Sequence, residues 1–84
     1  MKINDSYRII RRESEILLCN IKNGDVYQIN DVTAYTLSQC QHVVTHQELS
    51  EAVYDCFKDT SGDFSLSDMY QFVQQLIVDE ILVD

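Results

Sequence analysis

The chain has 84 residues, which is enough for one domain. Apolar residues make up 45% of it and charged residues 24%, a composition that excludes an intrinsically disordered protein. It contains no run of 18 apolar residues, and its first five residues lack the apolar stretch of a signal peptide. We therefore expect a cytoplasmic protein that does not cross a membrane.

The three cysteines, Cys19, Cys40 and Cys56, are widely spaced and form no CxxC pair. This spacing indicates neither a zinc knuckle nor a thioredoxin-type site. We expect three free and mostly buried thiols in a reducing compartment.

The formal net charge of −8 is unevenly distributed along the chain. Residues 1–22 carry five of the six cations and three acids, whereas residues 23–84 carry eleven acids and a single cation, Lys58. The first segment is therefore +2 and the second −10. This pattern predicts a basic edge on an acidic body.

Three strands are predicted in the first third of the chain. Residues 7–12 are rich in β-branched and aromatic types, and residues 15–21 are apolar on both faces, which is typical of a central strand. Asn23 and Gly24 then form the dipeptide preferred in a type I′ hairpin turn. On the returning strand, residues 25–29, alternation puts Tyr27 and Ile29 on one face, where we expect both to point into the core.

Three helices are predicted in the remainder. Asn30 is a good N-cap for a helix that runs to about residue 40. Thr45 and Glu48 have the spacing of a capping box at the start of a second helix, residues 45–57, and Ser67 is predicted to cap a third helix that runs to residue 79. The predicted core-facing residues of these helices are Val32, Tyr35 or Thr36, Leu37, Leu49, Ala52, Val53, Cys56, Phe57, Met69, Phe72, Val73, Leu76 and Ile77.

The predicted order is a small three-stranded antiparallel sheet followed by three helices. This is an α+β fold, similar to a winged helix-turn-helix, in one domain that spans residues 1–84. A short apolar tail at residues 81–83 closes the chain.

Several short motifs in this order resemble the PqqD-like family, the RiPP recognition elements that bind the leaders of ribosomally made, post-translationally modified peptides. The motifs are Leu17-Leu18, Asn23-Gly24, Tyr27-Gln28-Ile29-Asn30, Thr33-Ala34, Thr45-His46-Gln47-Glu48-Leu49, and Asp68, Phe72 and Leu76 followed by Asp79-Glu80-Ile81-Leu82. The resemblance covers about residues 7–83. Cys19-Asn20 stands where proteins of pyrroloquinoline quinone synthesis tend to have an aromatic-proline pair, so the chain looks more like the stand-alone leader-binding proteins of lasso-peptide clusters.

The resemblance implies a non-catalytic adaptor that binds a leader peptide by adding it as a strand to the edge of the third strand, beside the third helix. The implied peptide-binding residues are Asp25, Val26, Tyr27, Gln28 and Ile29 on the strand and Tyr70, Val73, Gln74 and Ile77 on the helix. The implied partners are the precursor's leader and a maturation enzyme, either a leader peptidase or a radical SAM enzyme. No cofactor is implied. Exposed strand edges also make a homodimer possible.

The alternative function is a winged-helix interaction or regulatory module that has no peptide client. DNA binding is disfavoured because residues 45–57 and 67–79 contain no Arg or Lys to contact phosphates or bases. A metal site at His42 and His46 is disfavoured because Thr45 starts a helix between them. The acids Glu48, Glu51 and Asp55 form like-charge neighbours rather than an acid/base pair, and we expect Cys56 to be packed, so no enzyme activity is predicted.

Overall fold

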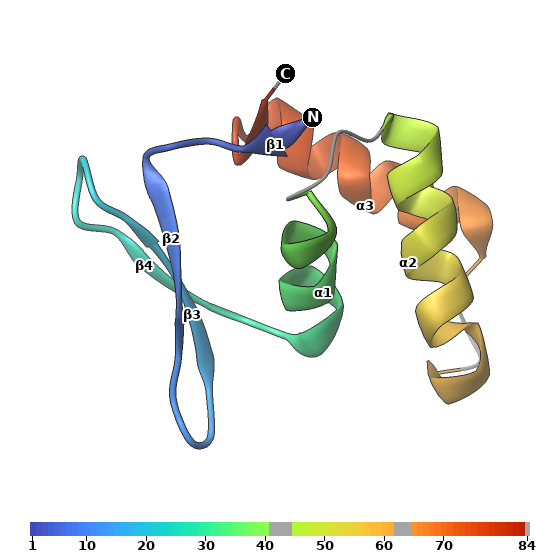
Figure 1. Cartoon of the computed structure of the whole chain (residues 1–84), viewed down its shortest axis with the longest axis horizontal. Coiled ribbons are helices and arrows are strands. Elements are labelled where there is room, and N and C mark those ends of the chain that lie inside the picture. The colour runs from blue at the N-terminus through green and yellow to red at the C-terminus, as the bar shows by residue number, and fades with distance from the viewer. Residues whose placement is uncertain (41–44, 62–64, 84) are drawn as a thin grey trace.

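The computed structural model of the chain describes residues 1–40, 45–61 and 65–83. The elements follow in the order β1 (Lys2–Ile3), β2 (Tyr7–Arg11), β3 (Ile16–Asn20), β4 (Val26–Ile29), α1 (Asp31–Gln39), α2 (His46–Ser61), α3 (Leu66–Val78) and β5 (Leu82–Val83), as Figure 1 shows. This order confirms the predicted α+β class, with a three-stranded antiparallel sheet followed by three helices. Within the described residues, no helix is both long enough and apolar enough to traverse a bilayer.

β3 is the central strand of the sheet β2-β3-β4, as its apolar sequence predicted. Its register sets Leu18 opposite Ile9 of β2 and opposite Tyr27 of β4. Leu18 is 2% exposed and belongs to the core, which identifies its face of the sheet as the one that the helices cover.

The turn between β3 and β4 lies where the sequence predicted it but is of another kind. It has four residues, 21–24, and the backbone N–H of Asn20 donates to the carbonyl oxygen of Asp25 across its base (2.8 Å). Gly24 has φ of 81°, whereas Asn23 has no positive φ, so the prediction of a two-residue type I′ turn is wrong. The Asn20 side chain stabilises this longer turn, because its Oδ1 accepts the N–H of Lys22 (3.0 Å).

Side-chain caps start the helices. Asn30 Oδ1 accepts the N–H of Thr33 (2.9 Å), which confirms the predicted N-cap of α1, and Thr45 Oγ1 accepts the N–H of Glu48 (3.1 Å). The predicted cap of α3 is wrong. Ser65, not Ser67, is the N-cap, in a capping box with Asp68 whose two bonds measure 2.9 and 3.2 Å.

The structure also contains a second, two-stranded sheet that the sequence did not predict. β1 pairs with β5, Lys2 opposite Val83 and Ile3 opposite Leu82. The two ends of the chain therefore lie side by side, as Figure 1 shows. Asn4 stabilises this pairing of the chain ends with two hydrogen bonds. Its Nδ2 donates to the carbonyl oxygen of Glu80 (2.9 Å), and its backbone N–H donates to the carbonyl oxygen of Ile81 (2.8 Å).

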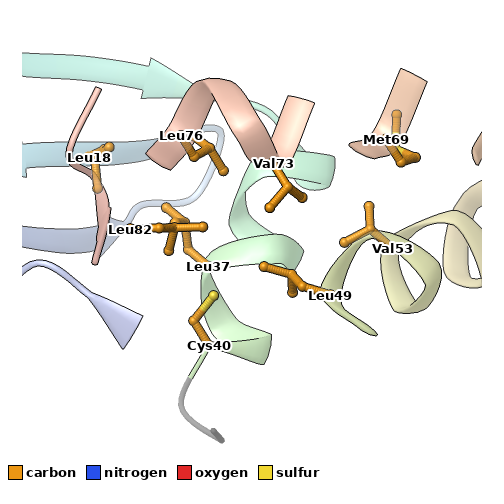
Figure 2. Packing of buried hydrophobic residues seen from close by; sticks show 9 residues of the cluster. All are labelled: Leu18, Leu37, Cys40, Leu49, Val53, Met69, Val73, Leu76 and Leu82. Atoms are coloured by element: carbon orange, nitrogen blue, oxygen red, sulfur yellow. The ribbon is translucent and has the colours of Figure 1, made fainter. Parts of the chain in front are cut away.

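The core joins all three helices, the central strand and β5 in one cluster, shown in Figure 2. Its buried members are Leu18, Leu37, Cys40, Leu49, Val53, Met69, Val73, Leu76 and Leu82. Most of the predicted core positions of the helices are thereby confirmed. Cys56 is an exception: it is exposed, so the expectation that it is packed is wrong, whereas Cys40 is buried as expected.

Candidate functional site

The outer edge of β4 is free of a neighbouring strand. β4 stands at the end of the sheet and pairs only with β3 in the described part of the chain. In an antiparallel pair, hydrogen-bonded and non-bonded residues alternate. Because Asp25 accepts from Asn20, Tyr27 and Ile29 also face β3, and the N–H and C=O groups of Val26 and Gln28 point outward. The open edge therefore presents the backbone of two residues.

The side chain of Tyr27 does not lie in the core. It is on the same face as Leu18, but it is 48% exposed because β4 is an edge strand and no further strand covers its outer side. Its hydroxyl donates to Asp25 Oδ2 (3.2 Å). The prediction that Tyr27 points into the core is therefore wrong, whereas Ile29 packs against the core as expected.

Carboxylates surround the Tyr27 hydroxyl. The charge of Asp25 and its hydrogen bond raise the pKa of Tyr27 above 10.0, and a smaller contribution to that pKa comes from Asp79, the C-cap of α3. Asp79 therefore lies within electrostatic range of the Tyr27 hydroxyl. Asp79 Oδ1 also accepts from Gln75 Nε2 (3.0 Å), one turn earlier on the helix.

α3 has two flanks beside its buried stripe of Met69, Val73 and Leu76. At 3.6 residues per turn, the predicted peptide-binding residues of the helix, apart from Val73, fall on one flank, and Asp79 falls on the other. The first flank consists of Tyr70, Gln74 and Ile77, and the second of Phe72, Gln75 and Asp79.

The first flank borders a hollow near each of its ends. The ring of Tyr70 stacks on His46 of α2 beside a hollow of about 350 Å³, and Ile77 lines a second hollow of about 240 Å³ with residues of the two chain ends. Val73 is completely buried, so it has no surface for the predicted contact with a peptide. Gln74 is exposed.

Only one histidine of the pair considered as a metal site lies within the described residues. His46 stacks on Tyr70, and His42 lies outside the described residues. Across residues 1–40, 45–61 and 65–83, no group of three His, Cys, Asp or Glu side chains is placed to hold a metal ion.

No family model and no curated protein matches the chain. Two solved structures share its fold. One is TbiB1 in complex with the TbiA(beta) leader peptide, at 16% identity and a TM-score of 0.68, with 100% of both chains covered. The other is a lasso peptide synthetase B1 complexed with the leader peptide, at 11% identity and a TM-score of 0.65, with 99% of this chain and 96% of that one covered. The fold is thus the one that the resemblance to RiPP recognition elements implied.

Proposed function

We propose that this protein is a non-catalytic adaptor that binds the leader segment of a ribosomal precursor peptide by β-strand addition and presents it to a maturation enzyme. The observation that carries the proposal is the open edge of β4, where the backbone groups of Val26 and Gln28 point outward. An added strand would satisfy these groups and extend the sheet. Both solved structures that share the fold are complexes with a leader peptide.

Side chains beside the edge would select the leader. Tyr27 lies half exposed on β4, and Asp79, which contributes to raising the pKa of Tyr27, shares a flank of α3 with Phe72 and Gln75. We propose that this flank borders the peptide groove, in place of the flank of Tyr70, Gln74 and Ile77 that the sequence favoured. The carboxylates of Asp25 and Asp79 favour Lys or Arg in the leader and act mainly on association rate and register.

Titration of a labelled leader from the precursor encoded beside the gene tests strand addition. Val26→Pro removes an outward N–H at the first position of an edge strand, where proline is compatible with folding. It should weaken leader binding about tenfold, because one backbone hydrogen bond is lost and the ring disturbs the approach of the peptide. Val26→Thr retains the N–H and is the matched control. Equal affinities of the two variants would contradict strand addition, and a wild type that binds no leader would favour the regulatory alternative.

The two flanks of α3 are distinguished by a pair of neighbouring substitutions. Gln74 and Gln75 are both exposed but lie on opposite sides of the buried stripe. Gln75→Arg should weaken leader binding about fivefold, because it places a bulky cation beside Asp79, whereas Gln74→Arg should change it less than twofold. The reverse result would move the groove to the flank of Tyr70.

A further inference from the structure

The sheet β2-β3-β4 has a second face that the helices do not cover. Side chains alternate along a strand, so the neighbours of Leu18 point away from the core. The register sets two rows of residues on this outer face, Arg8, Cys19 and Val26 in one and Ile10, Leu17 and Gln28 in the other. In Figure 1, α1, α2 and α3 all lie on one side of these strands.

Much of this outer face is apolar. Ile10 is 41% exposed and Val26 57%, and Ile21 in the following turn is 58% exposed. Leu17 and Cys19 of the central strand are half-buried by their neighbours on the sheet. None of these five side chains belongs to the core or packs against it. A contiguous apolar patch of this kind on a small domain is typical of an interaction surface.

Cations stand around this apolar patch although the protein is acidic. Arg8 lies in the outer row beside Cys19, and Lys22 follows Ile21 in the turn; both are exposed. Arg12 is also exposed, but its Nη1 is 3.9 Å from Glu15 Oε1, so a carboxylate offsets its charge. Arg8 is held by backbone carbonyls rather than by a carboxylate, since its Nη1 donates to the carbonyl oxygens of Asp5 (2.6 Å) and Tyr7 (2.9 Å). The outer face is therefore apolar at its centre and basic at its rim, whereas residues 23–84 are −10.

We propose that the outer face of the sheet docks the maturation enzyme, through an apolar patch with an acidic rim on that enzyme. This inference rests on the proposed function and adds the surface and the chemistry of the partner. Charge complementarity supports it, because a basic rim on an acidic protein attracts a partner of opposite local charge. The proposed docking face is also continuous with the proposed leader site. A leader strand added to β4 extends the same sheet, and its alternate side chains emerge beside Val26 on this face.

A second copy of the chain fits the face less well. The acidic surface that could complement it is on α2, where Glu48, Glu51 and Asp55 are exposed. A contact between the sheet of one copy and α2 of the next uses two different surfaces. Such a heterologous contact is repeated from copy to copy and does not close a dimer. A different protein is therefore the occupant that the charges favour.

The test measures binding of the purified maturation enzyme encoded beside the gene to the immobilised full-length adaptor, without leader. Ile10→Glu and Arg8→Glu should each weaken enzyme binding at least tenfold and leave leader affinity unchanged. Leu66→Glu and Lys58→Glu are the matched controls. Leu66 is exposed to a similar degree as Ile10 (43%) and Lys58→Glu changes the net charge as Arg8→Glu does, but both lie on helices. The controls should change enzyme binding less than twofold, with all four variants folded by circular dichroism.

Salt provides a second readout of the same contact. Raising NaCl from 0.05 to 0.5 M should weaken enzyme binding by the wild type severalfold, and by Arg8→Glu less steeply, because screening acts on the rim charges. Equal enzyme affinity of Ile10→Glu and the wild type would overturn the inference, as would a wild type without enzyme affinity. A wild-type dimer that Ile10→Glu converts to a monomer in sedimentation would also overturn it, by assigning the face to a second copy. Intact enzyme binding without leader binding would instead refute the proposed function.

Discussion

The imidazole of His46 lies flat on the ring of Tyr70, with ring centroids 3.8 Å apart and planes inclined by 9°. Its Nε2 is also 2.9 Å from the carbonyl oxygen of Tyr70. Because a carbonyl only accepts, this nitrogen must carry the hydrogen. The two contacts fasten the first turn of α2 to α3, which makes the pair a structural joint between the helices.

Replacing His46 should therefore affect stability and not peptide binding. His46→Ala removes a stacked ring and a hydrogen bond, which together contribute about 1–2 kcal/mol to the free energy of unfolding. Urea unfolding measures this loss, and leader titration should show the affinity of the wild type. Gln47→Ala, at the next and exposed position, is the control and should be close to neutral. Leader binding that fell with His46→Ala would place the Tyr70 flank in the groove.

Glu80 is strained by its position at the end of α3. It has φ of 60° and occupies the C′ position of a Schellman motif. In this motif the N–H of Ile81 donates to the carbonyl oxygen of Leu76 (3.0 Å), and the N–H of Glu80 donates to the carbonyl oxygen of Ile77 (3.0 Å). Glycine adopts this conformation without the clash of a Cβ atom, so Glu80→Gly should stabilise the protein by about 0.5–1 kcal/mol. Thermal and urea unfolding provide the measurement. Glu80→Ala removes the carboxylate but keeps the Cβ, and a gain as large as that of glycine would assign the effect to charge instead.

The buried thiol of Cys40 makes stability depend on alkaline pH. Burial raises the pKa of Cys40 from its ordinary value of 9.0 to about 11, so the folded protein retains a proton that the unfolded chain has lost. The contribution of this group to stability is complete below pH 9 and is lost as the pH rises toward 11. Unfolding free energies measured from pH 8 to 10.5 should therefore fall more steeply for the wild type than for Cys40→Ala. The exposed Cys56 supplies the control. If Cys56→Ala made the unfolding free energy as insensitive to pH as Cys40→Ala does, the Cys40 thiol would not be the source of the pH dependence.

The start of α3 can be assigned by two serine substitutions. The Ser65 hydroxyl oxygen accepts the backbone N–H of Asp68, and the backbone N–H of Ser65 donates to the Asp68 carboxylate. Ser67, by contrast, is an exposed residue in the first turn. Ser65→Ala should cost about 1 kcal/mol of unfolding free energy, and Ser67→Ala a few tenths at most. Equal costs in urea unfolding would show that the capping box does not stabilise the helix.

Local signals made much of the fold predictable. Asn30 accepts a backbone N–H within its own turn, and the uninterrupted apolar sequence of β3 reflects its place between two strands, so short stretches of sequence suffice for both predictions. Pairing of β1 with β5 joins residues from opposite ends of the chain, and strands of two residues have no period to detect. Ser67 was predicted as the cap where the structure has Ser65, because spacing alone does not decide between two nearby serines.

The sequence predicts the edge strand of the candidate site but does not decide between the two flanks of α3. A helical repeat gives the buried stripe of α3 and two equivalent flanks beside it, and only the packing of the helix decides which flank turns toward β4. The stacking of His46 on Tyr70 is part of that packing, and it joins residues of two different helices. Tyr27 was expected in the core because alternation identifies a face of the sheet but not its edge.

The pairing of Lys2 with Val83 has a consequence for engineering. Since the first and last strands are neighbours, the whole unit can be spliced into a surface loop of a host protein with little distortion of either, or reopened elsewhere as a circular permutant. In Figure 1 this seam lies away from the hairpin loops of β2, β3 and β4. A graft through the seam would keep the outer edge of β4 open to solvent, so the proposed strand addition could be tested within a host protein.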